Sequence, residues 1–236
     1  MKAPLCLLFA ALWSGAISHC SAQAQAGPST DREEYLSWDA KRAGSIAQST
    51  RVNGQVGKSL DFRVIHTERS YNFKLRATWF TPEVIRARAR LVQLADRLSV
   101  DATRALVAEA DLAGTTIILV ELDPREGSGV IPLDWAAFLQ PRGTTTEGRS
   151  TSKGTIRSSL RDFRALTGGF QRDYAYDSFW MTFPLQTEND EWILDSETEE
   201  IELAVRIYGK VGVVRWPVPA SIRARWTGEA DGEADR

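Results

Sequence analysis

Residues 73–122, FKLRATWFTPEVIRARARLVQLADRLSVDATRALVAEADLAGTTIILVEL, decide the fold of this chain. They open with alternating apolar and polar residues, which predicts a β-strand over Tyr71–Trp79. Thr81-Pro82-Glu83 then favours a helix start, because Thr caps free N–H groups, Pro fits the first helical position and Glu suits the positive end of the helix dipole. The continuous apolar run Ile117–Leu122 predicts a strand that is buried on both faces.

Two helices are predicted between those strands. The first carries an apolar stripe at helical spacing, made of Val84, Ile85, Leu91, Val92, Ala95 and Leu98. Ser99 can cap the second, which ends near Gly114 and carries Ala102, Leu106, Val107 and Ala110. Together they form a helical hairpin over about residues 81–113.

Further alternating stretches extend the β-structure on both sides of the hairpin. Leu60–His66 alternates and would pair with Tyr71–Trp79, and Tyr176–Leu185 alternates again. Ile201–Ile207 and Val211–Trp216 form a hairpin around a two-residue Gly209-Lys210 turn. Val130–Leu139 is expected to be extended or short-helical, with Trp135 and Phe138 facing inward. We therefore predict an α+β fold, a mostly antiparallel β-sandwich or curled sheet of six to seven strands with the helical hairpin inserted.

The first 26 residues are typical of a secretory signal peptide. Lys2 precedes an apolar run, and Ala22-Gln23-Ala24 and Ala24-Gln25-Ala26 are small-x-small cleavage sites. Cleavage there would export the chain to the periplasm or the medium and would remove both cysteines. Lipidation at Cys20 is an alternative, although His19 fits poorly before a lipidated cysteine. No other segment is long and apolar enough to span a membrane.

The rest of the chain divides into three parts. Residues 27–57 are expected to be loosely structured, because the stretch from Gly44 to Gly57 is polar and contains glycine, as a linker does. Residues 58–226 would form a single globular domain. Residues 227–236, with Gly-Glu-Ala-Asp repeated, are expected to be a disordered tail.

The composition excludes several kinds of chemistry. The chain has 29 Lys and Arg against 31 Asp and Glu, a balance that argues against a large nucleic-acid interface. After cleavage it holds no cysteine and only His66, so zinc, copper and haem sites lack their usual ligands, and we expect neither metal nor cofactor. A cysteine nucleophile is excluded. A Ser-His-Asp triad would need His66, which we interpret as a structural histidine.

Carboxylates are the remaining catalytic candidates. A glycosidase needs two of them at a fixed separation, and possible members are Glu121, Asp123, Asp173 and Asp177. An acidic loop lacks the regular spacing of a calcium loop and is better explained as solvated; it holds Glu188, Asp190, Glu191 and Asp195. Gly143–Ser150 imitates a phosphate-binding loop with Arg149 in place of the lysine, but no amphipathic helix follows it.

The strongest hint of a binding surface is aromatic. If Phe179, Met181 and Phe183 face the core, Tyr176 and Trp180 face outward. Arg206 and Tyr208 would lie on the outer face of the last hairpin, where Arg206 pairs with Val213 and Ala204 with Arg215. The candidate binding residues are therefore Tyr176, Trp180, Arg206, Tyr208 and Arg215, which suit contact with a protein or a glycan. The alternative is that the helical hairpin covers Tyr176 and Trp180, since an amphipathic helix pair must cover something.

These features favour an exported, non-catalytic binding or envelope-accessory protein, with an envelope protein or a glycan as its partner. The alternative is a glycan-directed hydrolase that uses a carboxylate pair, and a purely structural envelope component is a third hypothesis. The ligand and the oligomeric state are not specified by the sequence.

Overall fold

The computed structural model describes most of the chain after residue 32. The described residues are 33–57, 72–114, 116–124, 130–142, 151–169, 173–185, 192–193 and 197–223. Residues from Glu34 onward form one compact unit, and the description concerns that unit. The predicted leader, the strand expected at Leu60–His66 and the predicted tail lie outside the described residues, as do His66 and the residues of the acidic and phosphate-loop-like segments.

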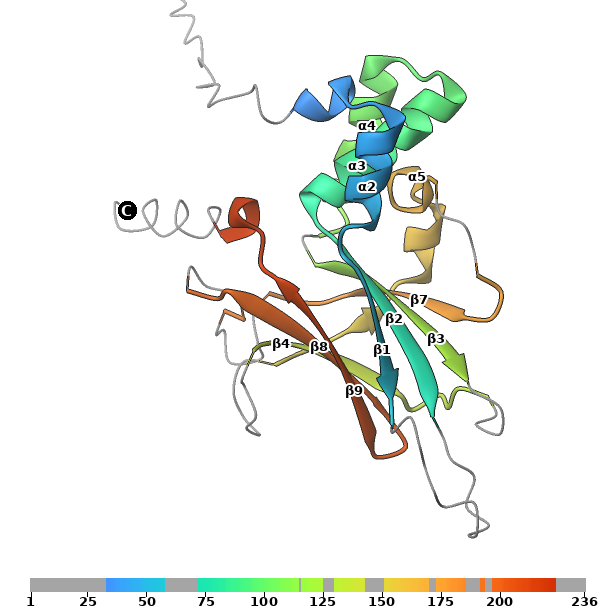
Figure 1. Cartoon of the computed structure of the whole chain (residues 1–236), viewed down its shortest axis with the longest axis vertical. Helices are drawn as coiled ribbons and strands as arrows, with labels where there is room; N and C mark the ends of the chain where they lie inside the picture. Colours follow the sequence, from blue (N-terminus) through green and yellow to red (C-terminus); the bar gives the residue numbers. More distant parts are fainter. Residues whose placement is uncertain are drawn as a thin grey trace, which may run out of the picture. The chain divides into compact units, whose positions relative to one another are not determined.

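The strands form two antiparallel sheets, as Figure 1 shows. Sheet A has the spatial order β1 (Arg51–Val56), β2 (Phe73–Phe80), β3 (Ile117–Pro124), β7 (Asp177–Thr182), β6 (Thr155–Ile156). Sheet B has the order β5 (Ser152–Lys153), β4 (Ala136–Pro141), β8 (Glu200–Ile207), β9 (Lys210–Pro217). The predicted α+β, antiparallel fold is confirmed. The described part holds nine strands rather than six or seven, and two of the nine have only two residues.

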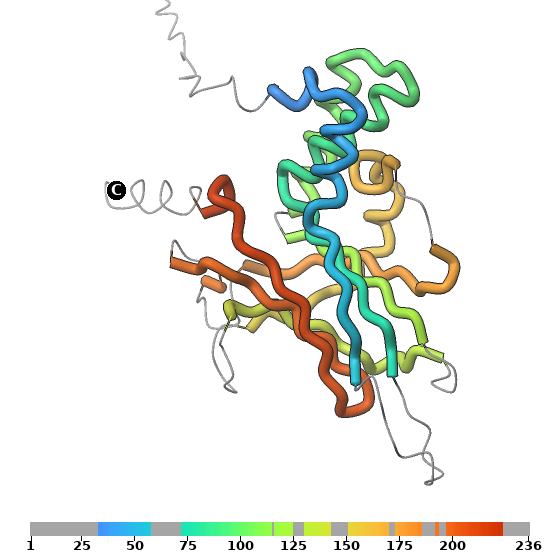
Figure 2. The backbone as a smooth tube through the Cα atoms, in the orientation of Figure 1, coloured from blue at the N-terminus to red at the C-terminus, as the bar shows by residue number. Residues whose placement is uncertain are grey.

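The predicted helical hairpin is confirmed as α3 (Pro82–Asp96) and α4 (Val100–Asp111). Thr81 caps α3 by accepting a hydrogen bond from the N–H of Val84, and Ser99 caps α4 by accepting one from Ala102. The other helical elements are η1 (Glu34–Ser37), α2 (Ala40–Gln48), η2 (Ser158–Asp162) and α5 (Arg164–Thr167). Figure 2 shows α2 beside α3, although β1 and β2 separate them in sequence.

The core has two parts, one on each face of sheet A. Between the sheets, inward residues of sheet A pack against inward residues of sheet B. They include Leu75, Val120 and Met181 of sheet A and Leu203 and Val214 of sheet B. On the opposite, outer face of sheet A, helical residues pack on Phe80, Ile117, Leu119 and Trp180. Strand β3 is buried on both faces, as its continuous apolar run predicted.

The prediction that residues 27–57 are loosely structured is wrong for the part that the structure describes. Asp39 caps α2 by accepting a hydrogen bond of 2.7 Å from the N–H of Arg42, and Ala43 and Ala47 are buried in the helical core. Residues 51–56 then form β1, which pairs with β2. The small and polar residues that imitate a linker belong to a small-residue helix face and an edge strand, so the globular unit begins before residue 58.

The two sheets meet along β1 and β9, and glycine makes the contact possible. A Cβ atom on Gly212 would lie 2.5 Å from the backbone oxygen of Gln55, and one on Gly54 would lie 2.9 Å from the Val214 side chain. The indole N–H of Trp216 donates a hydrogen bond of 2.6 Å to the backbone oxygen of Thr50 across the same junction. Only residues without side chains allow this close approach.

The opposite edges of the sheets are joined by the chain itself. β5 in sheet B and β6 in sheet A are separated by Gly154 alone. A Cβ atom there would lie 2.6 Å from the ring of Phe183, and the N–H of Gly154 bonds to the oxygen of Ala137. Glycines therefore allow the two sheets to come close together at both edges of the inner core.

The register of the β8–β9 hairpin differs from the prediction. Arg206 pairs with Val211 and Ala204 with Val213, so the turn residues are Tyr208 and Gly209 rather than Gly209 and Lys210. Both have positive φ, 48° and 73°, which is the type I′ geometry that matches the strand twist. A shift of two residues leaves every side chain on the face where the sequence placed it.

We expect Gly212→Ala to destabilise the protein by roughly 1–3 kcal/mol, because the new methyl group would overlap the β1 backbone. Gly44→Ala is the matched control. Nothing lies within 4 Å of a Cβ at Gly44, and alanine in the α2 interior should add roughly 0.5–1 kcal/mol. Urea unfolding measures both changes, and equal stability of the two variants would contradict the close approach of β1 and β9.

Candidate functional site

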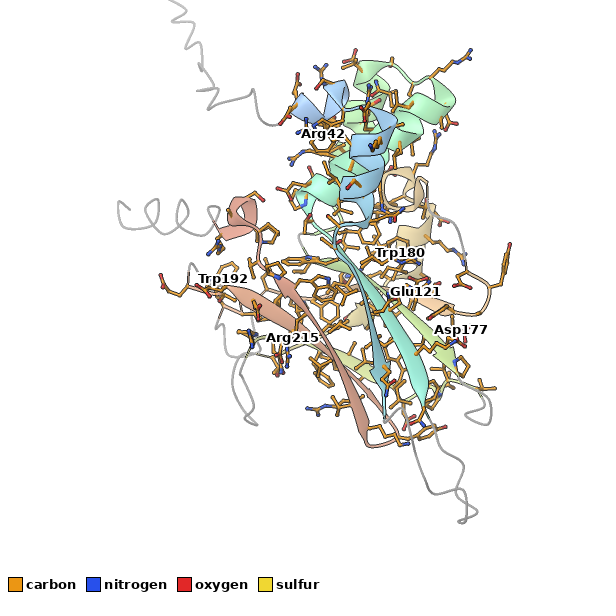
Figure 3. All side chains as sticks on the ribbon, in the orientation of Figure 1. Arg42, Glu121, Asp177, Trp180, Trp192 and Arg215 are labelled. Atoms are coloured by element: carbon orange, nitrogen blue, oxygen red, sulfur yellow. The ribbon has the colours of Figure 1, made fainter. Side chains whose placement is uncertain are left out.

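The five predicted binding residues lie on two different sheets. Trp180 belongs to β7 of sheet A, and Tyr176 comes directly before that strand. Arg206 and Arg215 belong to β8 and β9 of sheet B, and Tyr208 lies in the turn between them. Figure 3 labels Trp180 on sheet A and Arg215 on sheet B. The structure therefore does not bring the five residues into one site.

Trp180 is a packing residue. Its side chain is only 7% exposed and its ring centre lies 5.0 Å from that of Phe80, under the helical layer of sheet A. Trp180 faces away from the inner core, as expected, and of the two residues that the helical hairpin was expected to cover in the alternative, Trp180 alone belongs to the helical core. Trp180 therefore offers no free surface to a ligand.

Beyond Trp180 the outer face of sheet A becomes polar. Arg76 on β2 and Ser178 on β7 lie opposite Glu121 on β3, and the Glu121 side chain is fully buried. Arg76 Nη1 lies 3.5 Å from Glu121 Oε1, and Arg51 Nη2 lies 3.5 Å from Oε2. Glu121 Oε1 makes no hydrogen bond among the described residues. This polar cluster occupies the end of the face that the helical core leaves uncovered.

Tyr176, in the segment just before β7, lies at one side of this polar cluster. The Arg76 guanidinium lies 4.0 Å from the centre of the half-buried Tyr176 ring and donates hydrogen bonds of 3.4 Å to Asp173. Arg76 thus lies between two candidate carboxylates, Glu121 and Asp173. Asp123 is bound to Lys74 instead, at 2.7 Å, and Asp177 is exposed at the start of β7.

Burial dominates the electrostatics of this cluster. Burial raises the pKa of Glu121, although the charges of Arg51 and Arg76 act in the opposite direction. On α3, burial and the charge of Arg51 lower the pKa of Arg88 to about 10. A perturbed carboxyl can indicate a catalytic site, but a general acid must reach the glycosidic oxygen. The enclosed carboxyl of Glu121 does not favour that role.

The outer face of sheet B forms a second candidate surface. Side chains alternate along each strand, so three cross-strand rows face away from the core. The rows are Gln140–Glu202–Arg215, Phe138–Ala204–Val213 and Ala136–Arg206–Val211. The middle row is entirely apolar, and among the described residues none of these side chains belongs to either part of the core.

This face carries both aromatic and charged groups and is exposed only in part, because Ala204 and Glu202 are buried and Phe138 is half-buried. Tyr208 and Val211 are 50% exposed and Val213 is 40% exposed. The Arg206 guanidinium lies 4.8 Å from the centre of the Phe138 ring, and Arg215 Nε donates a hydrogen bond of 2.6 Å to Glu202. Arg206 and Arg215 therefore share this surface, and Tyr208 lies in the turn at its end.

Sequence reasoning missed the apolar part of this surface. Phe138 was expected to face inward with Trp135, but Ala137 and Leu139 occupy the inner positions of β4, and Phe138 points to the outer face. Trp135 packs on Phe179 at the margin of the core, with ring centres 4.8 Å apart. The alternation of Ala137 and Leu139 with Phe138 was the signal that could have placed it.

Comparison with known proteins does not identify the chain, because no protein-family model, no curated protein and no solved structure matches it. No helix within the described ranges has the length and apolarity needed to cross a membrane. The described residues also contain no group of three or more histidine, cysteine, aspartate or glutamate side chains that could hold a metal ion.

We expect Trp180→Ala to destabilise the protein by about 3–5 kcal/mol, because it removes a large buried ring beneath the helical layer. Tyr208→Asn is the matched surface variant and should change stability by less than about 0.5 kcal/mol, since Asn-Gly suits a type I′ turn. Thermal or urea unfolding measures both. A small effect of Trp180→Ala would show that the ring is not packed as described.

The raised pKa of Glu121 predicts a pH dependence of stability. A carboxyl whose pKa is higher in the folded than in the unfolded state contributes stability that is complete below the unfolded pKa and is lost as the pH rises through the folded value. Relative to Glu121→Gln, the wild-type chain should therefore gain stability as the pH falls from 7 toward 5. Urea unfolding across that range tests this. If the difference in unfolding free energy between the wild-type chain and Glu121→Gln changed in the opposite direction, the ion pairs would outweigh burial.

Proposed function

We propose that this chain is an exported, non-catalytic binding domain whose contact surface is the outer face of sheet B. The observation that carries the proposal is the apolar middle row Phe138–Ala204–Val213, in which Val213 is 40% exposed, Phe138 is half-buried and Ala204 is buried, and which belongs to neither of the two core clusters. An antiparallel sheet with a solvent-facing side normally places polar residues on that side. An exposed apolar patch rimmed by polar groups is typical of an interaction site.

The shape and chemistry of the face suit a protein contact. The rows are held by continuous antiparallel pairing of β4, β8 and β9, so the side chains are fixed before a partner arrives. Tyr208, Phe138 and the arginines supply the residue types that are enriched at interfaces. The predicted secretory leader supports an encounter outside the cytoplasm, with an envelope protein as the partner.

The alternative of a glycan-directed hydrolase has less support. The carboxylates that lie closest to one another in the polar cluster, Glu121 and Asp173, are both bound to Arg76. A hydrolase needs one carboxyl that donates a proton and a second that attacks or activates water, and both must reach the sugar. A buried Glu121 meets neither requirement.

Site-specific photocrosslinking in cells tests the proposal. A photoreactive phenylalanine derivative replaces Tyr208 in one strain and Tyr174, which is 86% exposed beside sheet A, in a second strain. We expect an envelope-protein adduct from the Tyr208 position and none from the Tyr174 position. The adduct should disappear when Val213→Glu is added. Adduct formation from the Tyr174 position alone would contradict the proposed surface.

A further inference from the structure

The charges on the outer face of sheet B are unevenly matched. Among the described residues, four cations and two anions lie on or beside its rows, and they are Arg142, Lys153, Arg206, Arg215, Glu200 and Glu202. Arg142 Nη1 lies 2.6 Å from Glu200 Oε2, and Arg215 Nε lies 2.6 Å from Glu202 Oε1. Both anions are thus already paired, and within the described ranges Lys153 and Arg206 have no carboxylate partner. Counted over the described residues, this face carries more cations than anions, on a chain whose formal net charge is −2.

The two unmatched cations stand on either side of one aromatic ring. Lys153 is the cross-strand partner of Phe138 on β5, and the Arg206 guanidinium lies 4.8 Å from the Phe138 ring centre. Ala204 and Val213 continue the row from Phe138 toward the edge of the sheet. An apolar strip therefore begins between two positive charges.

We infer that this face binds an acidic segment of a protein partner in which carboxylates alternate with apolar side chains. Carboxylates would pair with Arg206 and Lys153, while the apolar side chains cover Phe138 and Val213. The rows repeat at every second residue of each strand, which is the spacing of side chains on one side of an extended segment. A lipid surface has no such register, so the geometry favours a peptide. Charge complementarity of this kind sets specificity and association rate.

This inference rests on the proposed function, because it names the chemistry of the partner for the same surface. If the Tyr208 crosslink formed but an acidic segment were not bound, the inference would fail and the proposed function would stand. Absence of both the crosslink and the binding would remove the two together.

Fluorescence anisotropy with the purified exported chain tests the inference. The probe is a labelled synthetic peptide in which glutamate alternates with leucine, and the matched peptide has lysine in place of glutamate. We expect the glutamate peptide to bind at least about tenfold more tightly than the lysine peptide, and added salt to reduce its affinity. Arg206→Gln and Lys153→Gln should each weaken binding by about twofold to fivefold.

Arg104→Gln on α4 is the control, because it removes an exposed cation away from this face and should leave the affinity unchanged. Equal binding of the two peptides, or no binding of the glutamate peptide, would overturn the inference. Binding of the chain to phosphatidylglycerol vesicles without binding of the peptide would also overturn it and would indicate a membrane surface instead.

Discussion

The structure depends on one strand whose two faces are both apolar. Strand β3 runs through the interior of sheet A between β2 and β7, and its residues Ile117–Leu122 are buried. Apolar side chains on two faces require two covering layers. Sheet B covers the inner face, and the helices, including the hairpin inserted between β2 and β3, cover the outer one. Within the described part of the chain, neither part of the core includes an outward side chain of sheet B.

The helical cover of sheet A ends where the outer face changes from apolar to charged. Along β3 the outward residues are Ile117, Leu119 and then Glu121, and the helical core includes only the first two. Glu121 is still buried, and Arg51 and Arg76 surround it in place of apolar side chains. A buried ion pair is weak evidence for stability, since desolvation can exceed the attraction between the charges. The raised pKa of Glu121 has the same cause.

Local signals predicted the elements that they control. The caps at Thr81 and Ser99 and the apolar run of β3 depend on neighbouring residues, so the unit from β2 to β3 was predictable from sequence. β1 was not, because glycine is unfavourable in a strand by itself, and Gly54 lies in one through pairing with β2 and close approach to β9. The turn position was missed because Tyr208 adopts a positive φ that the type I′ turn requires.

The candidate surface was predictable in part, because local alternation along a strand determines which side chains share a face. The faces of Arg206 and Arg215 follow from a period of two and survive a register shift of two residues. Trp180 was also placed on the correct side of its strand, but its burial depends on helices from distant parts of the chain. To place Phe138 on the outer face, one must know at which residue β4 begins. The boundaries of helices and strands are the least certain part of a sequence-based prediction.

The central claim is that the outer face of sheet B is the surface left for a partner. Hydroxyl-radical footprinting of the purified chain and of the chain in intact envelopes tests it most directly. The account predicts that Tyr208 reacts in the purified chain and is protected in the envelope, while Tyr174 reacts equally in both. Unchanged reactivity of Tyr208 together with protection of Tyr174 would contradict it and would place the contact beside sheet A.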